Sequence, residues 1–154
     1  MTMYCCGCKR DVYVKIVKGS IACPHLKKYS LNSFYWCSLC NGYIAYEGGP
    51  RSGSACAIPD ARMRMARRHI HARLDPIWKQ GFKTQLEVYK LVSEHLGKTY
   101  HTSWLRSIDE ATIVWHFLGR VIDSLTPKQQ ERCKEMYKQL APKNTDRPRH
   151  LINH

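Results

Sequence analysis

Two C-x-x-C pairs constrain the fold of this chain more than any other feature of its sequence: Cys5/Cys8 and Cys37/Cys40. In each pair one tight turn can point both sulfurs the same way, and two such turns brought together supply the four thiolates of a tetrahedral zinc site. Four protein sulfurs fill the coordination shell, so no water can bind for hydrolysis. The sequence therefore predicts one structural Zn²⁺ ion, which stabilises a module too small to be held by apolar burial alone.

Turn residues accompany both pairs. Gly7 lies between the first two sulfurs, and Asn41-Gly42 follows the last one. These residue types tolerate the positive φ that tight turns often need. Residues 9–36 separate the pairs, a longer spacer than the roughly 15–20 residues of the commonest zinc pattern. We expect a hairpin and a loop around Pro24-His25 to fill the extra length.

Other residues compete with this ligand set. Cys23 or His25 could replace one of the four cysteines, and Cys6 could substitute for Cys5. A thioredoxin-like redox site would need a single C-x-x-C that follows a strand and opens a helix, which is not the pattern here. An iron–sulfur cluster could also use four thiolates, but nothing else in the sequence indicates electron transfer.

The chain divides into a cysteine-rich, strand-like front and a helical back, so we expect an α+β protein. Its β-branched and aromatic residues predict strands over residues 11–17 and 43–46, and the Gly- and Ser-rich segment 48–54 is typical of a loop. No apolar run approaches the roughly 20 residues that span a bilayer, and the start lacks the apolar stretch of a signal peptide, so we expect a cytoplasmic protein. The expected organisation is a zinc-ribbon-like module over residues 1–50, a helical domain over 51–141 and a basic flexible tail over 142–154.

Helix signals follow residue 80. One predicted helix has apolar residues on a single face and a glycine typical of a C-cap at its end: Phe82, Leu86, Tyr89, Leu96 and Gly97. Ser107 with Glu110 three residues later indicates a capping box for the next helix. Thr126-Pro127 with Gln129 indicates the start of the last one.

The charge balance favours a polyanionic partner. Lys and Arg number 25 against 12 Asp and Glu, which gives a formal net charge of +13 with the histidines neutral. A surplus of this size attracts polyanions, so nucleic acid is the first partner class to consider. The alternatives are a charge that serves solubility and a basic face that meets an acidic protein.

The densest cluster of arginines lies in residues 60–74, a predicted helix that Asp75-Pro76 is expected to stop or kink. At about 100° per residue, one stripe is apolar and faces the core: Met63, Ala66, Ile70 and Leu74. The adjacent stripe is cationic and matches the spacing of backbone phosphates: Arg64, Arg67, Arg68 and His71. Arg62 and Arg73 flank the core stripe on its other side. The plain alternative is an exposed helix whose arginines serve solubility.

The front module adds cations that we assign to the same nucleic-acid-binding face: Lys9, Arg10, Lys27 and Lys28. Five tyrosines are interleaved with the cations of this module: Tyr13, Tyr29, Tyr35, Tyr43 and Tyr46. Exposed rings beside cations can stack on unpaired bases. Tyrosines in strands, however, are more often half-buried residues of a sheet.

His71 and Asp75 are four residues apart, so on a helix the carboxylate can orient the imidazole. The simpler interpretation is that Asp75 stabilises the helix end while Trp78 packs between the two parts of the chain. A nuclease would need further ligands for a catalytic ion, and His69 is the only nearby candidate, with no matching pair of carboxylates. We therefore assign no catalytic residue.

Several motifs together resemble a known family: Cys5-x-x-Cys8, Pro24-His25, Phe34-Tyr35-Trp36-Cys37-x-x-Cys40-x-x-Tyr43-Ile44 and His71-x-x-x-Asp75-Pro76-Ile77-Trp78. Over about residues 4–122 the chain is similar to uncharacterised zinc-finger-containing proteins that are common in phage and prophage genomes. The resemblance implies a zinc-binding domain and a mobile-element origin, and it brings no assigned activity.

The leading hypothesis is a phage-type, structural-zinc protein that binds nucleic acid, with DNA favoured over RNA, through the arginine-rich helix and the lysines of the module. Contacts to the phosphate backbone would dominate, with little readout of sequence. The second hypothesis is a protein–protein adaptor or inhibitor that docks on a host complex through the same basic face. A nuclease that uses His71 and Asp75 is the third. No membrane or small-molecule partner is indicated.

Overall fold

The computed structural model describes residues 1–47 and 55–143 of the chain. The predicted loop over 48–54 and all but the first two residues of the predicted tail lie outside these residues. The fold class is α+β, as expected, with small β-sheets in the N-terminal part and helices in the C-terminal part. The chain divides into two compact units, the first made of Met1–Met63 with Ser103–Arg106 and the second of Arg64–Thr102 with Ser107–His154.

The first unit contains two three-stranded sheets, in the strand orders β2-β1-β6 and β3-β4-β5. Its elements are β1 (Thr2–Cys5), β2 (Arg10–Tyr13), β3 (Lys15–Lys18), α1 (Gly19–Ala22), the 3₁₀ turn η1 (Lys27–Tyr29), β4 (Ser33–Trp36), β5 (Tyr43–Ala45) and β6 (Ala57–Ile58). The predicted strand over residues 11–17 is split at Val14, so that β2 belongs to one sheet and β3 to the other. Strand β5 confirms the second predicted strand, over 43–46, except for its last residue, Tyr46.

Two antiparallel hairpins place the cysteine pairs. Strand β1 pairs with β2 so that Cys5 lies opposite Arg10, and β4 pairs with β5 so that Trp36 lies opposite Tyr43. Each C-x-x-C pair therefore occupies the turn of a hairpin. Strand β6 adds to the first sheet by parallel pairing with β1, which joins residues far apart in the sequence.

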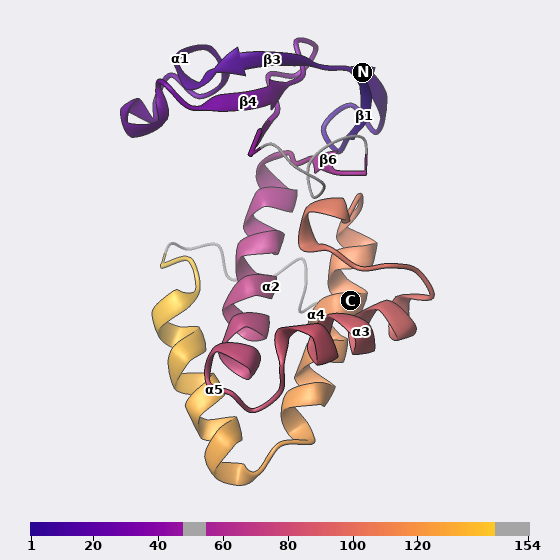
Figure 1. Ribbon diagram of the computed structural model, residues 1–154, viewed down its shortest axis with the longest axis vertical. Coiled ribbons are helices and arrows are strands. Elements are labelled where there is room, and N and C mark those ends of the chain that lie inside the picture. The colour runs from indigo at the N-terminus through magenta and orange to yellow at the C-terminus, as the bar shows by residue number, and fades with distance from the viewer. Residues whose placement is uncertain (48–54, 144–154) are drawn as a thin grey trace. The chain divides into compact units, whose positions relative to one another are not determined.

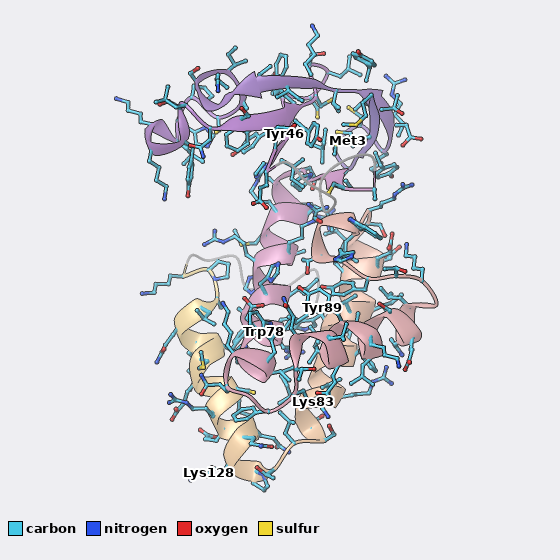
Figure 2. The ribbon with its side chains drawn as sticks, in the orientation of Figure 1. Met3, Tyr46, Trp78, Lys83, Tyr89 and Lys128 are labelled. Carbon is cyan, nitrogen blue, oxygen red and sulfur yellow. The ribbon has the colours of Figure 1, made fainter. Side chains whose placement is uncertain are left out.

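Two apolar clusters support the sheets, and the larger one contains residues of both sheets. The larger one contains Met3, Val12, Tyr35 and Ile58, with Trp104 packed against it, and Figure 2 labels Met3 within the first unit. The smaller one joins Ala22, Cys23 and Phe34 and lies against the other face of the sheet β3-β4-β5. Because successive strand residues alternate between faces, the neighbours Phe34 and Tyr35 serve different clusters.

The second unit is helical (Figure 1). Its helices are α2 (Ala61–Lys79, whose first three residues belong to the first unit), α3 (Gln85–Leu96), α4 (Ile108–Asp123) and α5 (Pro127–Leu140). The 3₁₀ turn η2 (Thr102–Trp104) precedes α4, and its last two residues belong to the first unit. The capping box predicted for α5 is present, formed by Thr126 and Gln129. At the start of α4 only half of the predicted box forms: Ser107 accepts the N–H of Glu110, while the Glu110 carboxylate pairs with Lys98. Gly97 ends α3 in the left-handed conformation, as expected.

Helix α2 does not stop at Asp75. It continues through Pro76 to Lys79, so of the two expected outcomes, a stop or a kink, the stop is wrong. A proline inside a helix removes one backbone hydrogen bond, but Leu74, Pro76 and Ile77 are all buried. We infer that apolar packing of this segment outweighs the lost bond.

The buried face of α3 also differs from the prediction. Val88 and Val92 are fully buried, whereas Leu86 is 78% exposed and Phe82 precedes the helix. A capping box formed by Thr84 and Glu87 starts the helix at Gln85. Val88 and Val92 are four residues apart, so a helix places them on one face. The larger side chains named in the prediction have a helical spacing too, and the spacing alone does not choose between the two sets.

Candidate metal centre

Four cysteine sulfurs from the two hairpin turns gather at one point of the first unit. The Sγ atoms of Cys5, Cys8, Cys37 and Cys40 all lie within 4.8 Å of one another. Sulfurs from opposite turns are the close pairs, with 3.4 Å between Cys5 and Cys40 and 3.7 Å between Cys8 and Cys37. A tetrahedral site with Zn–S bonds of about 2.3 Å has edges of about 3.8 Å. The arrangement therefore fits one tetrahedral zinc ion with little movement.

The two turns have the same backbone geometry. The N–H of Lys9 donates to the Cys5 carbonyl at 2.7 Å, and the N–H of Asn41 donates to the Cys37 carbonyl at 2.8 Å. Lys9 and Asn41 both adopt the left-handed conformation, with φ of 56° and 61°. Positive φ was expected at the asparagine and at Gly7, and in the first turn it occurs at Lys9 instead.

The glycines of the turns provide space for sulfur rather than positive φ. A Cβ atom on Gly7 would lie 3.1 Å from the Cys40 Sγ. On Gly42 it would lie 2.9 Å from Cγ2 of Ile58 and 3.3 Å from the same Sγ. A side chain at either position would therefore crowd the fourth sulfur, which is the exposed one of the set.

The thiols do not share one electrostatic environment. Burial raises the pKa of the Cys5 thiol far above its usual value, although the N–H of Cys8 opposes that rise. Burial also raises the pKa of Cys37, but the backbone N–H groups of Cys40 and Leu39 outweigh it and the net shift is downward. Amides directed at a sulfur stabilise the thiolate, which is the form that binds a metal.

The competing ligands lie elsewhere in the first unit. Cys23 is buried beside Phe34 in the smaller cluster, and the His25 side chain is exposed. The Sγ of Cys6 lies 4.0 Å from the carbonyl of Leu105. In the described ranges, the four named cysteines are the one group of three or more metal-ligating side chains brought within ligand distance. Neither an alternative cysteine nor His25 joins them.

The cations assigned to the nucleic-acid-binding face fall into two classes. Most are exposed to solvent: Lys9, Arg10, Lys27, Lys28, Arg62, Arg68 and His71, with Arg64 half-buried. The other two arginines of α2 lie in the second unit's interior. Arg67 is only 8% exposed. The guanidinium of Arg73 lies 3.5 Å from the ring centroid of Trp115 and donates to the carbonyl of the same residue at 2.9 Å.

The expected core stripe of α2 is buried as a whole: Met63, Ala66, Ile70 and Leu74. The cationic stripe next to it is narrower than expected, because Arg67 turns inward. His69, which lies on the flank of the core stripe, is buried as well and shares a hydrogen bond of 2.8 Å with the Tyr137 hydroxyl. The periodicity identified the core stripe but not how far burial extends on either side of it, since Tyr137 of α5 covers His69 and Tyr100 lies near Arg67.

Asp75 sits between two basic side chains, His71 and Lys79, one turn away on either side. Its carboxylate lies 3.2 Å from Nδ1 of His71 and 3.4 Å from Nζ of Lys79. Burial raises the pKa of Asp75, but the hydrogen bond and charge of His71, together with Lys79, outweigh burial and lower it. The carboxylate orients the imidazole as the sequence suggested, and among the described residues the pair belongs to no larger group of metal ligands.

Comparison with known proteins identifies the family of this arrangement. A family described as a zinc-finger-containing domain matches residues 2–120 of the chain. No curated protein and no solved structure matches the chain. None of the helices in the described part of the chain is long and apolar enough to cross a membrane. The family match and the four clustered cysteines together fit one structural zinc ion.

Proposed function

This chain belongs to the zinc-finger-containing domain family, and on that premise we propose that it is a structural-zinc protein that binds nucleic acid, with DNA as the favoured target. The ion is held by Cys5, Cys8, Cys37 and Cys40, and it fixes the two hairpins against each other. A mobile-element origin, implied by the motif resemblance, belongs to the same proposal.

The observation that carries this proposal is the distribution of charge in the zinc module. The chain has a formal net charge of +13, and residues 12–46 contain no Asp or Glu at all. The cations of this segment are exposed: Lys15, Lys18, Lys27 and Lys28. Exposed cations on a segment without acidic residues attract a polyanion, which releases its counterions on binding.

The arginine-rich helix makes a smaller contribution than its sequence suggests. Arg67 and Arg73 are buried or engaged in packing, so they are not available to phosphates. Arg62 and Arg68 are exposed, and Arg64 is half-buried. Backbone phosphates are therefore contacted by the module's lysines together with these outer arginines.

The test replaces exposed cations in matched pairs. There are two test pairs: Arg62→Glu with Arg68→Glu, and Lys27→Glu with Lys28→Glu. The control pair is Lys90→Glu with Lys128→Glu, at exposed lysines of α3 and α5, and it changes the net charge by the same amount as each test pair. We expect both test pairs to weaken binding to a labelled DNA at about 50 mM salt and to flatten its salt dependence, while the control pair keeps both close to wild type. Equal losses in all three pairs, or no binding by the wild-type chain, would contradict the proposal.

A second function is favoured by exposed apolar side chains. Leu31 of the first unit is 83% exposed, more than any other large hydrophobic residue of the described chain. An exposed apolar side chain of this size can serve a protein–protein contact, so an adaptor that docks on a host complex is the alternative. Recovery of one stoichiometric protein partner after nuclease treatment, lost on Leu31→Ser, favours the adaptor. If the chain cleaves no nucleic acid in the presence of Mg²⁺ or Mn²⁺, the third hypothesis, a nuclease that uses His71 and Asp75, is excluded.

A further inference from the structure

One end of the sheet β3-β4-β5 carries a folded projection, here called the tip and defined as residues 18–32. It comprises α1 and η1 (Figure 1). Two backbone hydrogen bonds close it, from Gly19 N–H to the Asn32 carbonyl at 2.8 Å and from Ser20 N–H to the Ser30 carbonyl at 3.1 Å. The tip is thus a hydrogen-bonded part of the first unit rather than an irregular loop.

Gly19 shows how closely the tip is packed. A Cβ atom on this residue would lie 1.9 Å from the carbonyl oxygen of Tyr29, a backbone atom that cannot move aside without opening the turn. On the inner side, Ala22 and Cys23 are buried against Phe34. The backbone of η1 is therefore held against α1, and the side chains that point outward are presented from a fixed support.

The outward side chains are unusually apolar for a basic surface. Leu31 is 83% exposed, Ile21 is 56% exposed and Tyr29 is 38% exposed. The two backbone bonds that close the tip bring the segments of Ile21 and Leu31 side by side. Exposed apolar side chains that gather in one place mark a contact surface.

Cations surround these side chains. Lys18, Lys27 and Lys28 are exposed, and the tip lies inside the segment 12–46, which has no acidic residue. The Nζ of Lys28 lies 4.7 Å from the centroid of the Tyr29 ring. An aromatic ring with a cation against it, flanked by further lysines, combines the two elements of single-strand binding, namely a stacking platform and a positive path for phosphates.

We propose that the tip binds single-stranded nucleic acid, with the lysines on phosphates and unpaired bases against Tyr29, Ile21 and Leu31. This inference rests on the proposed function and names its substrate class. A duplex keeps its base faces stacked inside, so it could use the lysines but not the three apolar side chains. The helix of the tip, α1, has only four residues and is too short to read a major groove.

The experiment titrates the full-length zinc-loaded chain against three probes: a labelled single strand of about 16 nucleotides, the duplex of the same sequence, and vesicles that contain phosphatidylserine. Tyr29→Ala and Leu31→Ser test the tip, and Tyr29→Phe should retain stacking. Leu86→Ser, an exposed leucine of the second unit, is the matched control. Zinc content and melting temperature are measured for every variant.

We expect the single strand to bind more tightly than the duplex and to lose about ten-fold in affinity on Tyr29→Ala, with Tyr29→Phe and the control unchanged. Lys27→Ala with Lys28→Ala should lower the salt slope for the single strand by about 1.4, because each phosphate contact contributes about 0.7. Duplex binding that equals single-strand binding, or a Tyr29→Ala variant with wild-type affinity, overturns the inference and leaves the proposed function standing. Failure of both nucleic acids to bind removes the proposed function itself, and binding to vesicles alone assigns the tip to a lipid surface instead.

Discussion

The guanidinium of Arg73 lies against the indole of Trp115, and Gly119 provides the room for it. A Cβ atom on Gly119 would lie 3.0 Å from the Nη1 atom of Arg73. Burial lowers the pKa of Arg73, while Tyr137 and Asp123 favour its charged form. At the scale of single residues, the second unit thus holds a cation in its interior by a ring contact and a carbonyl acceptor.

Replacing this arginine tests the arrangement. Arg73→Lys keeps the charge but loses the flat contact with the ring, so we expect the free energy of unfolding to fall by about 1–2 kcal/mol. Arg68→Lys, on the exposed side of the same helix, should change it by less than about 0.5 kcal/mol. Urea denaturation followed by circular dichroism measures both. Equal stability of the two variants would mean that the ring contact contributes nothing.

A second residue-scale prediction concerns the turns at the metal. Gly42→Ala places a methyl group 2.9 Å from Ile58 and 3.3 Å from the Cys40 sulfur. We expect a weaker zinc site, seen as faster transfer of zinc to a chelator such as a colorimetric dye. Gly81→Ala is an informative comparison, because nothing surrounds its Cβ position and its cost comes only from a φ of 74°. That variant should lose stability without losing zinc faster.

Among the elements, α5 lies beyond residue 120, where the family match ends. It packs on α4, and its Tyr137 contacts two residues that belong to other helices. The hydroxyl bonds to His69 of α2, and the ring lies 5.5 Å from that of Trp115 on α4, measured between centroids. Helix α5 therefore completes the second unit, although it lies outside the part that the family shares.

Tyr137→Phe isolates the polar contribution of α5. It removes the hydroxyl and leaves the ring, so the buried His69 loses this partner and we expect a loss of about 1–2 kcal/mol in the free energy of unfolding. Tyr13→Phe, at a tyrosine that is 70% exposed, is the control. Thermal and urea unfolding should agree on the order of the variants. A neutral Tyr137→Phe would mean that ring packing alone attaches α5.

The elements also show what could be predicted from the sequence. The metal centre was predictable because its ligands, turns and caps are short-range patterns: each C-x-x-C pair lies within a single hairpin turn. The split of residues 11–17 at Val14 could not be predicted, because the two strands are separated only by their partners: β2 pairs with β1, and β3 pairs with β4. The burial of Arg67 and the short strand β6 likewise depend on partners distant in the chain.

For the whole molecule, the two units differ in what stabilises them. The first has small sheets and two modest apolar clusters, of which only the larger includes ligand cysteines, whereas the second buries many helix residues. Below about 70–80 residues a single apolar core rarely suffices, so the first unit depends on its metal. Each unit contains two of the four tryptophans: Trp36 and Trp104 in the first, Trp78 and Trp115 in the second.

Removal of zinc should therefore unfold one unit and spare the other. With a strong chelator we expect the fluorescence of Trp36 and Trp104 to shift to longer wavelength, while the helical ellipticity of α2–α5 is largely kept. Acidification should have the same effect, because protons compete with zinc for the thiolates and displace it as the pH falls. Trp36→Phe with Trp104→Phe should abolish the fluorescence change. Simultaneous loss of helicity would show that the units do not unfold separately.

The first unit also includes Ser103–Arg106, and this has a consequence for the order of events during synthesis. Trp104 packs on the cluster around Met3, and the Cys56 Sγ lies 3.7 Å from the hydroxyl of Ser103. A ribosome must therefore release more than a hundred residues before the earliest strand of the protein has all its neighbours. The four zinc ligands leave the ribosome within the first 40 residues, but the apolar cluster beside them lacks Trp104 until α2 and α3 have been made, so the N-terminal part cannot finish packing first.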